Sequence, residues 1–384
     1  MITRDIAYIG VDDTDLDLFE SQYIIPNGIS YNSYLIKDKK IAIMDTADNR
    51  KIDEWLGNLR AALDGRTPDY LVVQHMEPDH AGCIAEILEE YPAIKIVASA
   101  RAIQMMPQFF EGRDFSQNTI AVKEGDTLSL GEHTLQFFMA PMVHWPEVMV
   151  TYDKKDKVVF SADGFGKFGA LSHEEDWACE ARRYYFNICG KYGGPVQALL
   201  KKLATLDVEC ICPLHGPILK ENLGYYIGLY DTWSKYDVET EGVFIAYASI
   251  HGGTAAVANV MAEILREKGA KKVSVADLSR DDMAEAIEDA FRMDKMIVAA
   301  ASYDGGVFPV MHDFLHHLQI KAYQKRRVGI IENGSWAPCA GRVMRGMLEQ
   351  MKDVEIAEPM VTILSRMKQS DRAALEALAD AILK

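Results

Sequence analysis

From Gly242 to its end, the chain repeats one local pattern, and this pattern limits the possible folds more than any other feature of the sequence. The apolar run 243–247 ends in a turn with two adjacent glycines, and a helical pattern with one apolar face follows. Further apolar runs, each separated from the next by a helical pattern, lie at about 272–276, 295–300 and 327–332. Strands that alternate with helices in this way predict a doubly wound parallel sheet.

The residues before this pattern are organised differently. Short apolar runs at 34–37, 41–44 and 70–74 precede helical patterns, and more extended runs follow between about 119 and 160. This mixture predicts a mixed sheet, or paired sheets, covered by helices. A chain of 384 residues is long enough to build two cores. We therefore expect two domains, 1–240 and 241–384.

The composition excludes several classes of partner and module. The chain has 57 Asp and Glu against 41 Lys and Arg, for a net charge of -16, and no basic run that would attract nucleic acid. The first residues lack the pattern of a secretory signal, and no stretch of about 18 apolar residues occurs, so we expect a cytoplasmic protein that does not enter a membrane. The six cysteines include no C-x-x-C pair, which argues against a disulfide framework and against a built-in rubredoxin or zinc-ribbon module.

Two histidines and two carboxylates crowd into the segment Gln74-His-Met-Glu-Pro-Asp-His80, directly after an apolar run. Residues two apart on a strand point to the same side, so His75 and Glu77 can converge. The proline favours an extended backbone before it, and the residues after it lead into a helical pattern over 81–90. Such a density of potential ligands at the end of a strand predicts a metal site.

Three further candidate ligands, His144, Asp163 and His215, each end an apolar run beside proline or glycine. A single histidine or Asp-Gly pair in such a place is more often a packed residue or a turn than a ligand. Beside the dense segment that balance reverses, because four candidate ligands already lie at the end of one strand.

In chain order these residues read His-x-Glu-x-Asp-His, then His, Asp and His, and the pattern resembles the metallo-β-lactamase-like domain of flavodiiron proteins. The similarity covers essentially the whole chain. Glu77 distinguishes the sequence from zinc hydrolases of the same fold, which typically have a histidine at that position. The resemblance implies a combined α/β and α+β architecture, in which an N-terminal αββα sandwich is followed by a flavodoxin-like domain.

The resemblance also implies a ligand set for two iron ions. It assigns His75, Glu77 and His144 to one iron, Asp79, His80 and His215 to the other, and Asp163 as the bridge between them. In some family members the histidine at the position of His80 turns away from the metal. Three carboxylates and four imidazoles form a hard donor set that suits iron rather than zinc. Trp145 is either a core aromatic or a wall of the substrate pocket, and we favour the wall.

The turn Ser249-Ile-His-Gly-Gly-Thr254 joins a strand to a helix and offers hydroxyls and backbone N–H groups to an anion. It matches neither the loop that binds nucleoside triphosphates nor the one that binds dinucleotides, so a mononucleotide remains. Two later loops, 302–309 and 332–340, follow strands of the same sheet, where such sheets bind ligands. Together the loops resemble the FMN site of flavodoxins. The expected contacts are Ser249, His251, Gly252, Gly253, Thr254, Ser302, Tyr303, Asp304, Gly305, Gly306, Asn333, Gly334, Ser335 and Trp336.

The function that the resemblance implies is oxidoreduction. Electrons are expected to pass from an external donor through FMN to the di-iron site, which reduces O2 to water, NO to N2O, or both. Family members pair head to tail, so we expect a homodimer of this kind or a dimer of such dimers. The donor is expected to be a separate molecule, rubredoxin as first choice and the reduced deazaflavin cofactor F420 as the alternative.

Two other functions fit parts of the sequence. A metallo-β-lactamase fold fused to a flavodoxin module could be a metal-dependent hydrolase that uses a metal-activated water, but Glu77 and the flavin loops argue against it. A non-catalytic electron carrier is disfavoured because all seven ligand positions are filled. The sequence leaves open the choice between O2 and NO.

Overall fold

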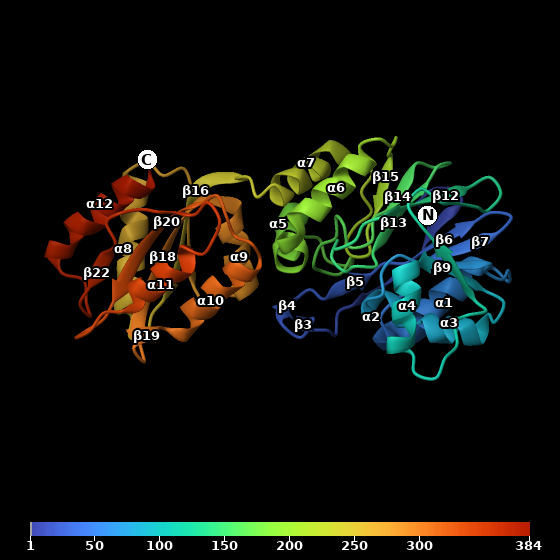
Figure 1. Ribbon diagram of the computed structural model, residues 1–384, viewed down its shortest axis with the longest axis horizontal. Coiled ribbons are helices and arrows are strands. Elements are labelled where there is room, and N and C mark those ends of the chain that lie inside the picture. Colours follow the sequence, from blue (N-terminus) through green and yellow to red (C-terminus); the bar gives the residue numbers. More distant parts are fainter. Residues whose placement is uncertain (1) are drawn as a thin grey trace. The chain divides into compact units, whose positions relative to one another are not determined.

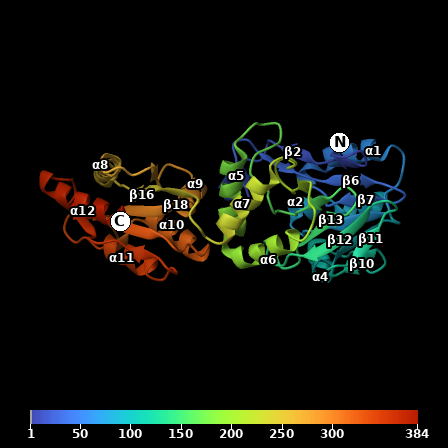
Figure 2. The same ribbon diagram turned by 90° about the horizontal axis from the view of Figure 1, so that it is seen from above.

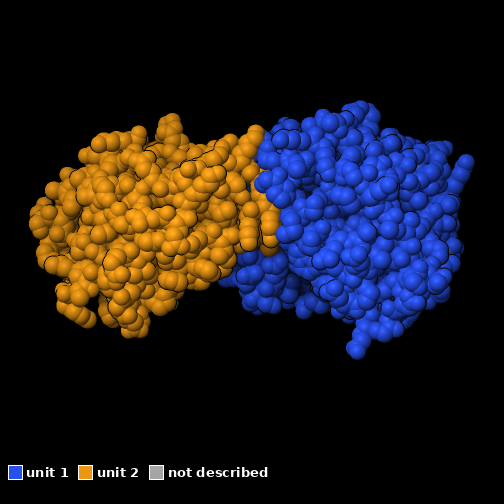
Figure 3. Space-filling model, viewed as in Figure 1, with its two compact units in different colours: residues 1–185, 194–231 blue, residues 186–193, 232–384 orange. Residues whose placement is uncertain are grey.

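The computed structural model describes residues 2–384 and divides the chain into two compact units (Figure 3). The first unit comprises residues 1–185 and 194–231, and the second comprises residues 186–193 and 232–384. The chain therefore passes from one unit to the other three times. None of the helices in the described part is both long and apolar enough to cross a membrane.

Two sheets face each other in the first unit (Figure 1). The first sheet has the order β1-β6-β7-β8-β9-β10 and is parallel from β7 to β10, whereas the second has the order β11-β12-β13-β14-β15 and is antiparallel except for its last pair. The strands of the two sheets are β1 (Ile6–Tyr8), β6 (Tyr34–Lys37), β7 (Ile41–Met44), β8 (Tyr70–Val73), β9 (Lys95–Ser99), β10 (Thr119–Val122), β11 (Thr127–Ser129), β12 (Thr134–Met139), β13 (Met149–Asp153), β14 (Val158–Phe160) and β15 (Cys210–Cys212). Two short ribbons pair β2 (Val11–Asp13) with β5 (Ile29–Tyr31) and β3 (Leu18–Phe19) with β4 (Tyr23–Ile24).

The core of the first unit lies between these sheets. Residues two apart on one strand, such as Ala42 and Met44 on β7, pack against Val158 and Phe160 on β14 of the other sheet, and all four are fully buried. This alternation is the one expected when a sheet buries one face against another sheet. The paired sheets predicted from the sequence are therefore observed, and their strand ends can share one edge of the sandwich.

Helices cover the outer faces of this sandwich (Figure 1). They are α1 (Ile52–Leu63), α2 (Pro78–Ala81), α3 (Ile84–Glu90) and α4 (Ala100–Phe109) with the first sheet, and α5 (Trp177–Tyr184), α6 (Gly193–Leu203) and α7 (Leu223–Ser234) with the second. Between α5 and α6 lie a π-helical turn, Tyr185–Cys189, and a 3-10 turn, Gly190–Tyr192. A single 3-10 turn, Asn49–Lys51, precedes α1.

The helix predicted over 81–90 is interrupted, which corrects that expectation. The backbone N–H of Cys83 donates to the hydroxyl of Thr46 at 3.3 Å, and the carbonyl of His80 accepts from the N–H and the hydroxyl of Thr46. These bonds replace the ladder that would join α2 to α3, so the short helix α2 is fixed to the end of β7 instead.

The second unit contains one mainly parallel sheet with the order β17-β16-β18-β20, continued by β21 and β22. Its strands are β16 (Thr240–Ala248), β17 (Val273–Asp277), β18 (Met293–Tyr303), β20 (Arg327–Asn333), β21 (Glu355–Ile356) and β22 (Val361–Ile363), with the short β19 (Gly306–Val307) turned back antiparallel on β18. Strand order reverses between β16 and β18, as in flavodoxin-like sheets. The doubly wound sheet predicted from the sequence is confirmed.

Helices cover both faces of this sheet, and Figure 2 shows α8 and α11 on opposite sides of β16 and β18. The helices α8 (Gly253–Glu267) and α12 (Arg372–Ile382), the latter preceded by a 3-10 turn (Gln369–Asp371), pack on one face. The helices α9 (Met283–Arg292), α10 (Pro309–Ile320) and α11 (Ala340–Leu348) contact each other and the strands of the other face. The loops that follow β16, β18, β20 and β22 all leave the carboxyl edge of the sheet.

The segment 186–193 belongs to the second unit although it lies far from the rest of that unit in sequence. The ring of Phe186 stacks on that of Phe291, with the centroids 4.3 Å apart and the planes at 13°. The side-chain amide of Asn187 donates to the carbonyl of Ala284 at 3.1 Å, and Lys321 donates to the carbonyl of Asn187 at 2.6 Å. The segment is thus packed and hydrogen-bonded to α9 and α10.

Candidate metal centre and cofactor cavity

The structure brings all seven candidate metal ligands together at the carboxyl ends of strands from both sheets. They are His75 and Glu77 after β8, Asp79 and His80 on α2, His144 between β12 and β13, Asp163 after β14 and His215 after β15. We call these seven residues the metal cage. Because parallel and antiparallel strands of both sheets end at this edge, side chains far apart in sequence share one space.

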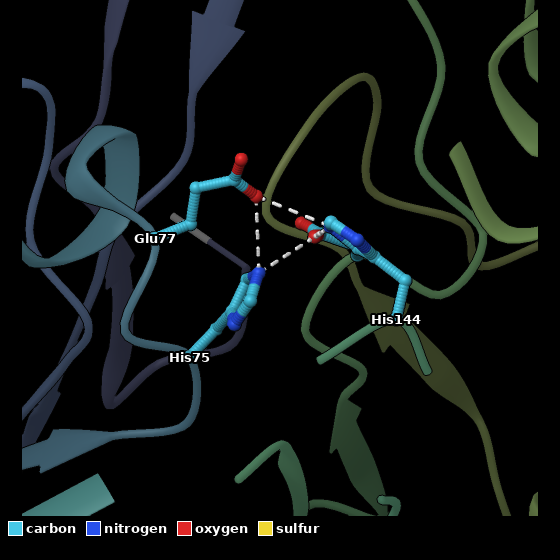
Figure 4. Close-up of side chains that lie close together, drawn as sticks. His75, Glu77 and His144 are labelled. Carbon is cyan, nitrogen blue, oxygen red and sulfur yellow. Dashed lines mark hydrogen bonds and ion pairs between the residues drawn. The ribbon is translucent and has the colours of Figure 1, made fainter. Parts of the chain in front are cut away.

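One half of the cage contains His75, Glu77 and His144, which point toward one another in Figure 4. Oε2 of Glu77 lies 3.2 Å from Nε2 of His75 and 3.1 Å from Nε2 of His144. Oδ2 of Asp163 lies 3.2 Å and 3.1 Å from the same two nitrogens. One ligand atom from each of the four side chains lies within 4.8 Å of the others, so a single cation could contact them all.

The other half contains Asp79, His80 and His215. Oδ2 of Asp79 lies 3.3 Å from Nε2 of His80 and 3.3 Å from Nε2 of His215. The second oxygen of Asp163, Oδ1, lies 3.1 Å from Nε2 of His80 and 3.8 Å from Nε2 of His215. Each oxygen of Asp163 therefore faces a different half of the cage, which is the arrangement of a carboxylate between two metal ions. His80 points into the cage and does not turn away from it.

The cage has the unsatisfied polar atoms that a pair of cations would satisfy. Both carboxylate oxygens of Asp79 and of Asp163, both ring nitrogens of His80 and Nε2 of His215 are buried without a hydrogen-bond partner. A buried polar atom without a partner costs free energy, and most native proteins contain few of them. Oxygen and imidazole donors, with no thiolate among them, fit iron better than a soft metal. The residues present therefore fit a di-iron centre.

Electrostatics within the cage favour the charged forms of His75, His144 and Asp163. Burial lowers the pKa of His75 and His144, but the carboxylates of Asp163 and Glu77 outweigh it, so that the pKa of His75 lies well above its usual value and that of His144 is raised to about 9. Burial raises the pKa of Asp163, but the imidazoles of His75 and His80 hold it well below its usual value. Metal binding at these imidazoles would therefore release protons.

Sequence reasoning missed two buried carboxylates behind the cage, Glu147 and Asp45. Oε1 of Glu147 lies 2.8 Å from Nδ1 of His75 and accepts from the backbone N–H of Met76 at 2.9 Å. Asp45 accepts from the backbone N–H and the side-chain amide of Gln74 at 2.7 Å and 2.9 Å. Each stands directly beside an apolar run, which signals a buried charge, but the sequence cannot name the partner of that charge. Both fix the start of the dense ligand segment.

Trp145 lies against the cage. Its ring is half-buried and meets the imidazole of His75 edge-on, with the centroids 5.2 Å apart, and it stacks on Phe109 at 6.4 Å. Phe109 is 39% exposed, so the aromatic pair extends from a candidate ligand to the surface. The role of Trp145 as a pocket wall stays a prediction.

The second unit has a cavity of about 580 Å³ at the carboxyl edge of its sheet. Its wall contains every predicted flavin contact except Gly252, which lies just before α8, and Gly306, which lies in β19. The wall is completed by Ile250, Ala301, Ala337, Cys339, Ser365 and Arg366. We call this space the flavin cavity.

Local contacts suit the flavin cavity to a mononucleotide. The hydroxyl of Ser249 is buried without a hydrogen-bond partner, and α8 begins just beyond it with backbone N–H groups that have no partner within the helix. Two aromatic side chains, Tyr303 and Trp336, are 45% and 92% exposed on the later loops. An unpaired hydroxyl at a helix N-terminus fits a phosphate, and flat exposed rings fit a planar ring system.

A fourth loop, after β22, also lines the cavity and was missed from the sequence. The hydroxyl of Ser365 lies 2.7 Å from that of Ser335, and its carbonyl accepts from the side-chain amide of Asn333 at 2.9 Å. A Cβ atom added to Gly253 would lie 2.4 Å from the carbonyl oxygen of Ser365. This loop was not recognised because β22 has only three residues and no glycine follows it, so neither strand nor turn is visible in the sequence.

Comparisons with known proteins agree with this geometry. A family model described as ODP family beta lactamase matches residues 29–216. An uncharacterized protein of Methanocaldococcus jannaschii is 30% identical over 357 residues, which cover 91% of this chain and 89% of that protein. The anaerobic nitric oxide reductase flavorubredoxin of Escherichia coli is 28% identical over 88% of this chain and 72% of its own length. The chain spans less of some other relatives, such as 64% of a putative diflavin flavoprotein of Synechocystis.

Solved structures agree over the full length. The rubredoxin oxygen:oxidoreductase of Desulfovibrio gigas superposes with a TM-score of 0.93 and 26% identity, covering 100% of this chain and 97% of that one. The fold expected from the resemblance, a metallo-β-lactamase-like domain followed by a flavodoxin-like domain, is thereby confirmed. The chain belongs to the flavodiiron protein family.

Proposed function

We propose that this flavodiiron protein is an oxidoreductase that reduces O2 to water, NO to N2O, or both, with electrons from an external donor. The relatives support both substrates, because one is named an oxygen oxidoreductase and another a nitric oxide reductase. The single observation that carries the proposal is the position of Asp163, whose two oxygens face the two halves of the metal cage.

We assign His75, Glu77 and His144 to one iron, Asp79, His80 and His215 to the other, and Asp163 to both. We assign the walls of the flavin cavity to FMN. When bound, FMN takes up an electron pair and the two irons one electron each, which matches the four electrons needed to reduce O2 to water.

The protein side chains contribute orientation. Nδ1 of His75 faces the carboxylate of Glu147 at 2.8 Å, and Nδ1 of His215 faces the backbone carbonyl of Ser30 at 2.7 Å. Each contact holds the ring proton on Nδ1 and leaves Nε2 directed into the cage. The rings of Trp145 and Phe109 would limit the entry of water on one side of the cage, where a restricted pocket favours small apolar gases.

The test is a direct comparison of the two substrates. Full-length protein with measured iron and FMN content is reduced anaerobically, and the initial rates of O2 and NO consumption are recorded with electrodes. Because the reduced protein stores about four electrons, we expect at least one gas to be consumed, at about one O2 or four NO per chain, and with many turnovers when an excess of reduced electron donor is supplied. Consumption of neither gas, by protein that contains both cofactors and reduced flavin, contradicts the proposed function.

The main rival is a metal-dependent hydrolase. It requires a water-activating site, for which zinc hydrolases of this fold use a histidine at the position of Glu77. Elemental analysis of purified protein separates the two functions, because iron at about two ions per chain supports the oxidoreductase and zinc alone supports the hydrolase. Ester and phosphodiester substrates provide the second measurement.

We further propose that two chains pair head to tail, so that the flavin of one serves the irons of the other, and that rubredoxin is the donor in the cytoplasm. Two relatives, a rubredoxin oxygen:oxidoreductase and a flavorubredoxin, support rubredoxin over F420. Mixing an Asp163→Ala chain with a chain that cannot bind FMN tests the pairing. Neither variant alone should consume O2 or NO. In a mixed dimer, the flavin of the Asp163→Ala chain would face the intact metal cage of the other chain, so gas consumption should return if electrons cross between chains. No recovery in an isolated mixed dimer contradicts this arrangement.

A further inference from the structure

The fourth loop of the flavin cavity is fixed against the N-terminus of α8. Beyond its contact with Gly253, the carbonyl of Ser365 shares the side-chain amide of Asn333 with the hydroxyl of Thr254, at 2.9 Å and 3.3 Å. The backbone N–H of Ser365 donates to the side-chain oxygen of Asn333 at 3.0 Å. The main chain at Ser365 is therefore held beside the first turn of α8. The main chain of the next residue, Arg366, lies close to the same turn.

Arg366 is the only lysine or arginine in the described wall of the flavin cavity. The loop 249–254 offers hydroxyls, backbone N–H groups and His251, but no permanently charged cation. Within residues 2–384 the guanidinium of Arg366 has no carboxylate at ion-pair distance, although the chain carries an excess of acidic residues. A cation that has no acidic partner in such a chain is available to an anionic ligand.

We propose that Arg366 binds the terminal phosphate of FMN and supplies its counter-charge. This inference rests on the proposed FMN site and extends it to a residue outside the three glycine-containing loops. A guanidinium can form two parallel hydrogen bonds to a phosphate and carries a full positive charge. The N-terminus of a helix offers N–H groups but only a partial charge. The phosphate would then be held between the N–H groups of α8 and the side chain of Arg366.

The position of the main chain favours the phosphate over the flavin ring. The carbonyl carbon of Ser365, to which the nitrogen of Arg366 is bonded, would lie 3.5 Å from a Cβ atom added to Gly253 at the start of α8. The exposed rings of Tyr303 and Trp336 that suit the isoalloxazine lie on the loops after β18 and β20. Arg366 therefore starts at the helix end of the cavity, where a phosphate benefits from the helix dipole.

The test compares FMN with riboflavin, which has the same ring but no phosphate. Full-length protein is stripped of FMN with its metals in place, and dissociation constants for both flavins are measured from the quenching of flavin fluorescence. In Arg366→Gln we expect FMN to bind about tenfold more weakly and riboflavin to bind as in the wild type, since a charge-assisted hydrogen bond is lost. Arg366→Lys should lie between the two proteins for FMN.

Arg266→Gln is the matched control, because Arg266 lies in the last turn of the same helix and is exposed. It should bind both flavins like the wild type. An equal loss of FMN and riboflavin affinity in Arg366→Gln, or no loss of either, overturns the inference. Unchanged riboflavin binding also shows that the cavity is folded. If the wild type binds no FMN at all, the proposed function fails instead, so the two failures are distinguishable.

Discussion

The metal cage and the flavin cavity recognise their ligands in opposite ways. In the cage the imidazoles of His75, His80 and His215 are 0% exposed, and charged side chains provide the contacts. In the cavity the side chain of Trp336 is 92% exposed, and the wall consists mainly of hydroxyls, backbone groups and aromatic rings on four loops, with Arg366 as its one basic side chain other than His251. A buried cage concentrates its function in single side chains, whereas a wall of loops distributes it. Single substitutions should therefore have much larger effects on metal than on flavin.

Asp163→Ala should have the largest effect and is the strongest test of this contrast. Loss of the carboxylate that faces both halves of the cage should remove iron and lower turnover by more than about a hundredfold. This is more than the loss expected when a hydrogen-bond partner of a ligand is removed. FMN absorbance per chain should be unchanged. Metal analysis, absorbance and gas consumption measure these outcomes. Asp114→Ala, at an exposed position of the same unit, should change none of them; retention of both irons with normal turnover removes Asp163 from its bridging role.

Glu147→Gln should weaken metal binding by about 10- to 100-fold, because the partner that orients His75 loses its charge. Competition with a chelator measures the affinity, and FMN binding serves as the internal reference. The exposed Glu124→Gln, in the same unit, is the control. If both variants bind metal equally well, the cage does not depend on its buried outer carboxylate, and the contrast with the cavity is weaker than proposed.

Gly253→Ala should lower FMN affinity by about tenfold while iron content stays constant. The added Cβ atom would lie 2.4 Å from the carbonyl oxygen of Ser365, so the fourth loop must shift away from α8, at a cost of about 1–3 kcal/mol. Flavin fluorescence titration measures the affinity. Gly346→Ala, on α11 with no atom within 4 Å of the new Cβ, should leave FMN affinity unchanged and raise stability slightly.

Trp336→Ala should have the smallest effect. Loss of one stacking ring is worth about 0.5–1.5 kcal/mol, which is a loss of FMN affinity of about two- to tenfold. The flavin-free protein should keep its melting temperature, because the side chain packs against little in the protein. Trp336→Phe should restore most of the affinity. A loss much larger than tenfold would mean that the cavity, like the cage, depends on a single side chain.

Residues that the structure brings together could be found in the sequence where the signal lies within one short segment. His75 and Glu77 are two residues apart after an apolar run, and the loop 249–254 shows its glycines and hydroxyls directly. Both signals depend on strand ends, which hydrophobic periodicity locates. The same reasoning identified the parallel alternation of the second unit.

The missed features depend on contacts between distant segments. The carboxylate of Glu147 is recognisable only once His75 is placed beside it, 72 residues away in sequence. The loop at Ser365 follows a strand too short to show a period, and the interruption before α3 arises from hydrogen bonds to Thr46 on another segment. Such pairings are set by tertiary packing, which a single sequence does not encode locally.

Because residues 186–193 belong to the second unit, an exchange of domains between related proteins has to include this segment. A single genetic crossover near residue 240 would transfer the flavin-binding sheet without residues 186–193. In this segment Phe186 stacks on Phe291, and Asn187 donates a hydrogen bond to α9. The recipient would inherit a module with an uncovered aromatic ring and an unmatched carbonyl at Ala284. A chimaera of two related proteins should therefore fold only when residues 186–193 and the flavin-binding sheet come from the same parent protein.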